Sequence, residues 1–312
     1  TAYAGAITIS STLQTTNSGN ISMTSAGSST FGNSATVTSA GTLSVNAGTI
    51  SSTATLSAGG NATLVASADS STVGLTSTTG NISVRAAGGD VTTGGTTSTS
   101  ATGASILLKA TGSVFVGSNA VTTQNGPITF WADYDNQTDG AIKVGTSGSV
   151  TSNGGAITFG GGNGATAADG YARTTAGIRV ATSYTAVAIY GSVNSGAGAI
   201  LIRGSDPALY GTSYSAACEL MRSARVIATT GTITFECVVP STQTNTSVNH
   251  WGFINGNDGT GTGANIQSTT GNISITGDTS ASNYAARYAI GFYYGGMSSD
   301  SGTISLNPVG AS

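Results

Sequence analysis

Gly155-Ala156-Ile157-Thr158-Phe159 is one copy of a five-residue pattern that recurs along the whole chain. The pattern is Gly, any residue, an apolar residue, usually Ser or Thr, and a second apolar residue. Gly gives the backbone the freedom that a corner needs. The triplet alternates with the period of two of a β-strand, so two side chains face one way and one faces the other. The clear copies begin at Gly5, Gly19, Gly41, Gly80, Gly126, Gly155, Gly198, Gly231, Gly271 and Gly302.

The spacing of the copies predicts an all-β solenoid. Gly41, Gly60 and Gly80 follow one another at nearly equal intervals of roughly 20 residues, which suits one coil of three short strands. From Gly126 onward the clear copies lie farther apart, at intervals of roughly 30–40 residues, which indicates loop insertions. At ~20–25 residues per coil, about a dozen coils are expected in one rod, roughly 60–70 Å long. We expect regular Ser/Thr/Gly-rich coils over 1–125 and wider coils with aromatic-rich insertions over 126–312, continuous as one solenoid.

The composition suits a core that is thin and long. Of the residues, 47 are Gly and only 7% are charged, while 38% are apolar; a typical soluble domain has roughly 25% charged residues. The alternation places Arg85, Lys143, Arg203 and Glu236 on the outside, as a dry core requires. The stretch 215–228 is the one that tolerates a helix, and a short helix in an insertion is an alternative there.

Charge and hydropathy argue against two classes of partner. The net charge is −3, and the nine Lys and Arg residues lie scattered along the chain, so no basic patch for nucleic acid is expected. No apolar run approaches the roughly 20 residues that span a bilayer. Low charge with abundant Ser, Thr and Gly suits a secreted protein or a cell surface.

The repeat resembles the β-helical repeats of filamentous-haemagglutinin-like exoproteins and autotransporter passenger domains. The resemblance covers nearly the whole chain. It is carried by the Gly-Asn-Ile-Ser copies at 19–22, 80–83 and 271–274, by the Gly-x-Ile-Thr-Phe copies at 126, 155 and 231, and by the stretch 270–296. The resemblance implies a right-handed parallel β-helix, export across a bacterial envelope, and an adhesive or scaffolding role.

The loop 131–140 holds the densest group of acids. Asp133, Asp135 and Asp139 follow a D-x-D-x-x-x-D spacing, and alternate Asp residues can turn their oxygens to one calcium ion. No bidentate Glu follows, so a solvated loop with Asx-turns is the alternative. Because the stacked core should hold the coils together, we expect removal of divalent cations to have little effect on the fold. No other cofactor is predicted.

Catalytic groups do not converge in the sequence, so we expect no enzyme activity. The chain has only two Glu residues, Glu219 and Glu236, and most Asp residues are alone in separate loops. His250, the single histidine, has no acid or nucleophile near it in the sequence.

Aromatic residues gather beyond residue 130, in or near the longer inserts. They either pack the wider coils, which we expect for half of the tyrosines, or form a lateral surface for a partner, since Tyr and Trp are preferred interface anchors. The interface candidates are Tyr171, Tyr184, Tyr190, Tyr210, Tyr214, Tyr284, Tyr288, Tyr293, Tyr294 and Trp251.

Cys218 and Cys237 are separated in the sequence by the same interval as Gly41 and Gly60, which is close to one coil without insertions. Positions one coil apart stack at ~4.8 Å, inside the ~4.4–6.8 Å Cα window of a disulfide. We therefore expect the two cysteines to be stacked neighbours, either bonded or as two buried thiols in contact, with the bond favoured in an exported protein.

Three function classes remain open. The first is a structural or adhesive segment of a secreted or cell-surface fibrous protein, and the second is a subunit of an extracellular filament or sheath that assembles through end-to-end strand stacking. The third is an ice-binding or glycan-binding face of outward Thr, although the Thr36-Val37-Thr38 triplet does not recur on a fixed period. The expected partners are other copies of the chain, or cell-surface or glycan ligands.

Overall fold

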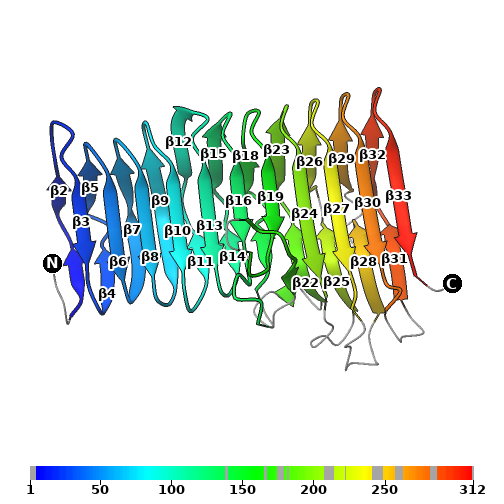
Figure 1. Ribbon diagram of the computed structural model, residues 1–312, viewed down its shortest axis with the longest axis horizontal. Helices are drawn as coiled ribbons and strands as arrows, with labels where there is room; N and C mark the ends of the chain where they lie inside the picture. Colours follow the sequence, from blue (N-terminus) through cyan, green and yellow to red (C-terminus); the bar gives the residue numbers. More distant parts are fainter. Residues whose placement is uncertain are drawn as a thin grey trace.

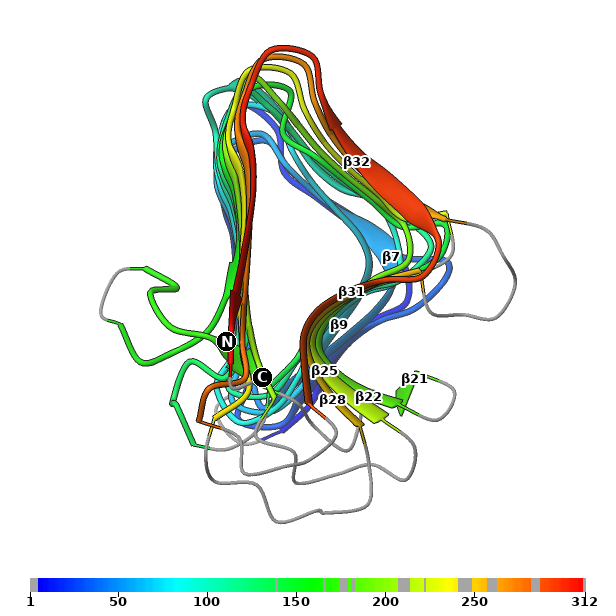
Figure 2. The same cartoon turned by 90° about the vertical axis from the view of Figure 1, so that its right-hand side faces the viewer.

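The computed structural model describes residues 5–137, 140–164, 167–173, 179–180, 183–206, 214–221, 223–240, 249–256, 263–281 and 287–310. These residues form β-strands and connecting turns and contain no helix. The strands wind into one rod (Figure 1) with a three-sided cross-section (Figure 2). The predicted all-β parallel solenoid is confirmed. None of the described residues forms a helix that could cross a membrane.

One side of the rod, wall I, is a sheet in which each coil adds one parallel strand. Its order follows the chain without interruption, and it passes residue 125 without a break, because β13 pairs directly with β16. The strands are β3 (Ile21–Thr24), β6 (Leu43–Ala47), β8 (Ala62–Ala66), β10 (Ile82–Ala86), β13 (Ile106–Ala110), β16 (Ile128–Trp131), β19 (Ile157–Gly160), β24 (Ile200–Ser205), β27 (Ile233–Val238), β30 (Ile273–Asp278) and β33 (Ile304–Val309).

The other two sides, walls II and III, belong to one 21-stranded sheet, because β7 (Thr49–Ala58) and β9 (Ser70–Ser77) run through both. Wall II also contains β1 (Ile7–Ile9), β4 (Ser28–Phe31), β11 (Val91–Thr93), β14 (Val114–Val116), β17 (Ile142–Val144), β22 (Ser183–Ile189), β25 (Tyr214–Leu220), β28 (Asn249–Asn255) and β31 (Arg287–Phe292). Wall III contains β2 (Thr12–Gln14), β5 (Thr36–Ser39), β12 (Thr97–Thr102), β15 (Ala120–Gln124), β18 (Ser149–Thr151), β23 (Ser192–Gly196), β26 (Arg225–Ala228), β29 (Ala264–Ser268) and β32 (Gly295–Ser299).

The winding is right-handed. Seen from the C-terminal end, the chain runs up walls II and III and down wall I while it advances toward the viewer (Figure 2). Two short strands lie outside this pattern: β20 (Ala172–Arg173) pairs with the end of β24, and β21 (Arg179–Val180) pairs antiparallel with β22. The helix considered for 215–228 is wrong, since β25 and β26 occupy most of that stretch; its small and β-branched residues stack onto neighbouring strands instead.

The inward side chains of wall I form one buried stack along the rod. Ile128, Ile157, Ile200 and Ile233 are register partners from coil to coil, and so are Phe130, Phe159, Ile202 and Phe235. Each of them is at most 1% exposed. The rings of Phe130 and Phe159 stack face to face at 4.7 Å. The alternation also leaves Arg85 exposed and Lys143, Arg203 and Glu236 half-buried on the outside, as predicted.

The corner between walls III and I explains why the repeat begins with Gly. A Cβ atom at Gly155, Gly198 or Gly231 would collide with the carbonyl oxygen of the corner Gly one coil earlier. A buried hydroxyl just before the Gly stabilises the corner: Ser152 Oγ donates to the carbonyl of Gly155, and Thr123 Oγ1 donates to that of Gly126 at 2.6 Å. The corner therefore favours a Ser/Thr-x-x-Gly sequence, which joins wall III to wall I.

The Asn of the Gly-Asn-Ile-Ser copies also ties coils together. Asn61 Oδ1 accepts a hydrogen bond from the backbone N–H of Asn81 at 2.8 Å, and Asn81 Oδ1 accepts one from that of Ser105 at 2.7 Å. Asn272 Oδ1 makes the same bond to Thr303, at 2.8 Å. These side chains replace backbone partners at a corner where the strand ladder is interrupted.

Candidate functional site

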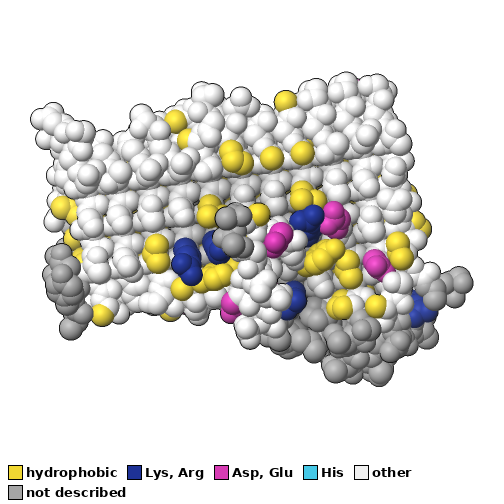
Figure 3. All heavy atoms as spheres, viewed as in Figure 1, with side chains coloured by type: hydrophobic (Ala, Val, Ile, Leu, Met, Phe, Trp, Pro, Cys, Tyr) yellow, Lys and Arg dark blue, Asp and Glu magenta, His cyan; other side chains and the backbone are white. Residues whose placement is uncertain are grey.

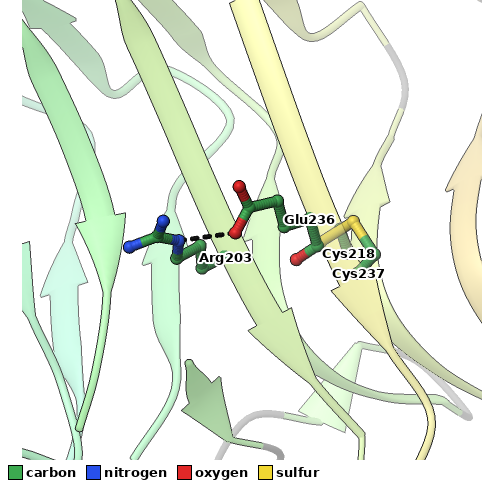
Figure 4. The surroundings of a disulfide bond; sticks show 4 residues. All are labelled: Arg203, Cys218, Glu236 and Cys237. Carbon is green, nitrogen blue, oxygen red and sulfur yellow. Dashed lines mark hydrogen bonds and ion pairs between the residues drawn. A yellow bond between two sulfur atoms is a disulfide. The ribbon is translucent and has the colours of Figure 1, made fainter. Parts of the chain in front are cut away.

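Cys218 and Cys237 form a disulfide with a Cα–Cα distance of 5.7 Å (Figure 4). The expected proximity of the two cysteines and the favoured bond are confirmed, but the predicted stacking one coil apart is wrong. Cys218 lies on β25 of wall II, in register with Val187 and Phe253, whereas Cys237 lies on β27 of wall I, in register with Gly204 and Gly277.

The disulfide crosses the interior within one coil. At this height the strands β24, β27 and β30 of wall I begin at residues 200, 233 and 273, so each coil is much longer than the regular coils near the N-terminus. A sequence separation of 19 therefore reaches only from one wall to another.

Walls I and II approach each other closely where the disulfide lies. A Cβ atom at Gly204 or Gly277 of wall I would collide with the carbonyl oxygen of Ala217 or Ala289 of wall II. Small residues therefore line both sides of this narrow corner. The disulfide joins the two walls in the coil between those of Gly204 and Gly277. Beyond the corner the first residues of β22, β25 and β28 flare outward (Figure 2).

The predicted metal loop is held by an arginine. Asp133 has a positive φ of 47° and a fully buried side chain, whose Oδ1 accepts a hydrogen bond from the Gln137 N–H at 2.9 Å. Its Oδ2 has no hydrogen-bond partner and lies 3.4 Å from Arg173 Nε. Asp135 is exposed, and Asp139 lies outside the described residues. Across the described part of the chain, no three His, Cys, Asp or Glu side chains are placed to hold a metal. Calcium binding by the loop stays a prediction.

Burial raises the pKa of Asp133 to about 7, and the nearby Arg173 guanidinium only partly offsets it. Since the unfolded chain loses this proton near the ordinary pKa of 3.8, the stability of the fold should fall as the pH rises from about 4 to about 7 and then level off. A shift of this size corresponds to about 4 kcal/mol without screening, and solvent near the loop lowers the expected loss to about 1–3 kcal/mol. Asp133→Asn should flatten the profile in urea unfolding at each pH, while Asp300→Asn, at an exposed site on another coil, should not. An unchanged profile in Asp133→Asn would contradict the assignment.

The aromatic interface candidates separate into two groups. Tyr288, Tyr293 and Tyr294 are 43%, 52% and 45% exposed at the last coil. Trp251 is buried and stacks on Tyr288 at 4.1 Å, and Tyr190 packs in an outer cluster with Ala141, Ala188 and Met221.

The remaining tyrosine candidates lie on different parts of the chain. Tyr171 is half-buried, and burial, together with the Glu236 carboxylate, raises its pKa. Tyr184 and Tyr214 lie in β22 and β25, and Tyr210 and Tyr284 lie outside the described residues.

A buried polar group that the sequence did not predict lies beside the narrow corner. Ser215 Oγ lies 2.8 Å from His250 Nδ1 and donates a hydrogen bond to Asp206 Oδ2. His250 Nδ1 is 3.4 Å from the same carboxylate, and all three residues are fully buried. His250 therefore does have an acid and a hydroxyl beside it, brought there by the fold from distant parts of the sequence. Both of these contacts involve Nδ1 of the imidazole. We interpret the group as a satisfied buried network.

The pairing register of the wall II strands is the information that could have revealed this group. Ser215 and His250 are partners on β25 and β28, one coil apart, and Asp206 follows the end of β24 directly across the corner. Insertions of unequal length between these strands hide the relation in the sequence.

The outer face of wall I carries a pair of cations. Arg85 and Lys109 are register partners on β10 and β13. Lys109 Nζ lies 3.5 Å from the ring centroid of Trp131, the next partner in the same row, and 4.6 Å from that of Tyr134. Arg85 Nη2 donates a hydrogen bond to Tyr134 Oη at 2.9 Å. Burial, and then the Arg85 charge, lower the pKa of Lys109.

An open groove of about 460 Å³ on wall I meets this pair at Trp131, which lines the groove and whose ring contacts Lys109. One side is formed by outward residues of the strands and the other by Ala167, Ala168 and Asp169 of the segment after β19. Figure 3 faces wall I and shows Lys and Arg side chains on either side of this protruding segment. The strand side presents Leu107, Thr129, Trp131, Thr158, Leu201 and Arg203.

Taken together, the strands, corners and outer face define the chain as a parallel β-solenoid with a surface groove. Comparison of the chain with protein-family models finds no match. Comparisons with curated proteins and with solved structures also find none. The resemblance to filamentous-haemagglutinin-like repeats thus stays a hypothesis.

Proposed function

We propose that this chain is a structural or adhesive β-solenoid of a secreted or cell-surface fibrous protein, without enzymatic activity. The observation that carries the proposal is the uninterrupted stack of inward side chains along wall I, from Ile21 to Ile273, each in register with the next coil. Such a stack makes a long rod whose outer face is free to vary, which suits a scaffold or stalk.

The disulfide supports an extracellular location. Cys218 and Cys237 are both fully buried, and their bond joins two walls of the wide coils. Disulfides form and persist in oxidising compartments and are rare in a reducing cytosol.

Adhesion is tested with beads that carry the folded chain. The proposal expects these beads to be retained under flow on a layer of cells or of cell-surface polysaccharide. Beads carrying reduced, unfolded chain serve as the control. Equal retention of the two kinds of bead would contradict an adhesive role for the folded rod.

A second candidate is a filament subunit, which the last described coil favours. Ile304, Leu306 and Val309 of β33 are 40%, 45% and 41% exposed, although the first two occupy inward positions of the repeat. At the opposite end, Ile7, Ile9, Leu13, Ile21 and Met23 line a hollow of about 510 Å³. In this candidate, the first coil of another copy stacks on β31, β32 and β33 by parallel strand pairing.

Electron microscopy and light scattering separate the two candidates. Short single rods support the stalk, and end-to-end polymers support the filament. If polymers form, Leu306→Arg should dissolve them, because a charge would enter the junction, whereas Asn307→Arg, at an outward position of the same strand, should not. Polymers that resist Leu306→Arg would rule out this junction.

A further inference from the structure

We propose that the Arg85–Lys109 pair and the adjoining groove on wall I form a binding site for an anionic polysaccharide. The inference rests on the proposed adhesive function and gives it a ligand class. It concerns the outer face of β10, β13, β16 and β19 together with the segment 167–169.

The cation pair is arranged to receive an anion. Two like charges stacked in register repel each other, and neither Arg85 nor Lys109 forms an ion pair with a carboxylate within the described residues. The aromatic rings of Trp131 and Tyr134 hold the two cations on the outer face through cation–π contacts. A carboxylate or sulfate group bound between them would relieve the repulsion and restore hydrogen bonds to the partly desolvated Lys109 ammonium.

The groove next to the pair has the mixed chemistry that a sugar ring needs. Thr129 and Thr158 are register partners and offer hydroxyl groups, while Leu107 and Leu201 lie before and after them in the same row and offer apolar surface. Sugar rings present hydroxyl groups at their rims and C–H groups on their faces, so both kinds of surface find partners. The row runs along the rod axis at strand spacing, so a linear polymer fits better than a compact ligand.

The same geometry argues against a nucleic acid. Single-stranded nucleic acids bind by stacking their bases on open aromatic faces. Trp131 is only 2% exposed, because Lys109 lies against its ring and its Nε1 donates to the Gly162 carbonyl at 2.7 Å.

Calorimetric titration of the folded chain tests the proposal with four probes: a galacturonate hexamer, a sulfated hexasaccharide, neutral maltohexaose and an oligothymidylate. We expect at least one acidic hexasaccharide to bind, more weakly at higher salt, and the neutral one not to bind. The two acidic probes distinguish a carboxylate from a sulfate ligand. Absence of binding by both, or equal binding of maltohexaose or oligothymidylate, would overturn the proposal.

Variants then locate the site. The double variant Arg85→Gln/Lys109→Gln should lose affinity by about tenfold or more, and Lys109→Arg should retain most of it. Lys143→Gln is the matched control, because Lys143 also lies over an aromatic ring, Tyr190 at 5.4 Å, but on wall II. All three positions face outward, and thermal melts check that the variants fold. Unchanged binding in the double variant would refute the assignment.

The two proposals fail in different ways. If beads carrying Arg85→Gln/Lys109→Gln adhere as well as beads carrying the parent chain, adhesion stands and the cation site is refuted. If the folded chain binds an acidic hexasaccharide in solution but its beads do not adhere, the site stands and the adhesive function is refuted.

Discussion

Phe159→Asp should destabilise the rod by about 4–5 kcal/mol, the largest effect expected of a single substitution here. Phe159 is fully buried on β19, stacks on Phe130 at 4.7 Å, and is in register with Ile202. The substitution removes the ring from this stack and places a carboxyl group in a core that offers it no hydrogen-bond donor among its register partners. The measurement is the free energy of unfolding in urea, followed by circular dichroism.

Thr158→Asp is the matched control, because Thr158 is the neighbouring residue on the same strand and its side chain faces outward. An outward carboxylate keeps its hydration, so a change within about 0.5 kcal/mol is expected. If Phe159→Asp unfolded at the same urea concentration as Thr158→Asp, the register of wall I described above would be wrong.

Removing the disulfide with Cys218→Ala/Cys237→Ala should cost about 3 kcal/mol. The bond closes a loop, at a sequence separation of 19, that includes β26, and it joins walls II and I at their narrow corner. Opening this loop increases the conformational freedom of the unfolded chain, and loss of the sulfur atoms leaves a gap in a fully buried position. Urea unfolding of the variant and of the parent chain measures the difference.

Two observations check the interpretation of that loss. Peptide mapping without reductant should recover Cys218 and Cys237 in one linked peptide. The parent chain, once unfolded, reduced and refolded under reductant, should have the same free energy of unfolding as the double variant. A double variant as stable as the oxidised parent would show that the two walls are held by packing alone.

The sequence by itself determined the strands and corners of wall I. Its evidence was local: a Gly at the corner, then an apolar–polar–apolar triplet with the strand period, as at 126–130 and 155–159. Backbone stacking enforces this pattern directly, since a side chain at Gly155 has no room and a polar residue at Ile157 has no partner. Inward and outward positions such as Phe159 and Arg85 could therefore be assigned without a structure.

Only the tertiary structure decided which residues meet across insertions. The coils that contain Cys218, Ser215 and His250 differ in length, so separation in sequence no longer measures distance along the rod. This is why Cys218 and Cys237 face each other across a coil instead of stacking, and why Asp206 lies against His250.

The Arg85–Lys109 pair is also a feature that only the tertiary structure decided. Arg85 and Lys109 lie on successive coils of a weakly acidic chain, and nothing in the sequence between them marks the two residues as neighbours. Strand pairing places their charges on adjacent strands of one outer face, because each coil advances the rod by a single strand spacing.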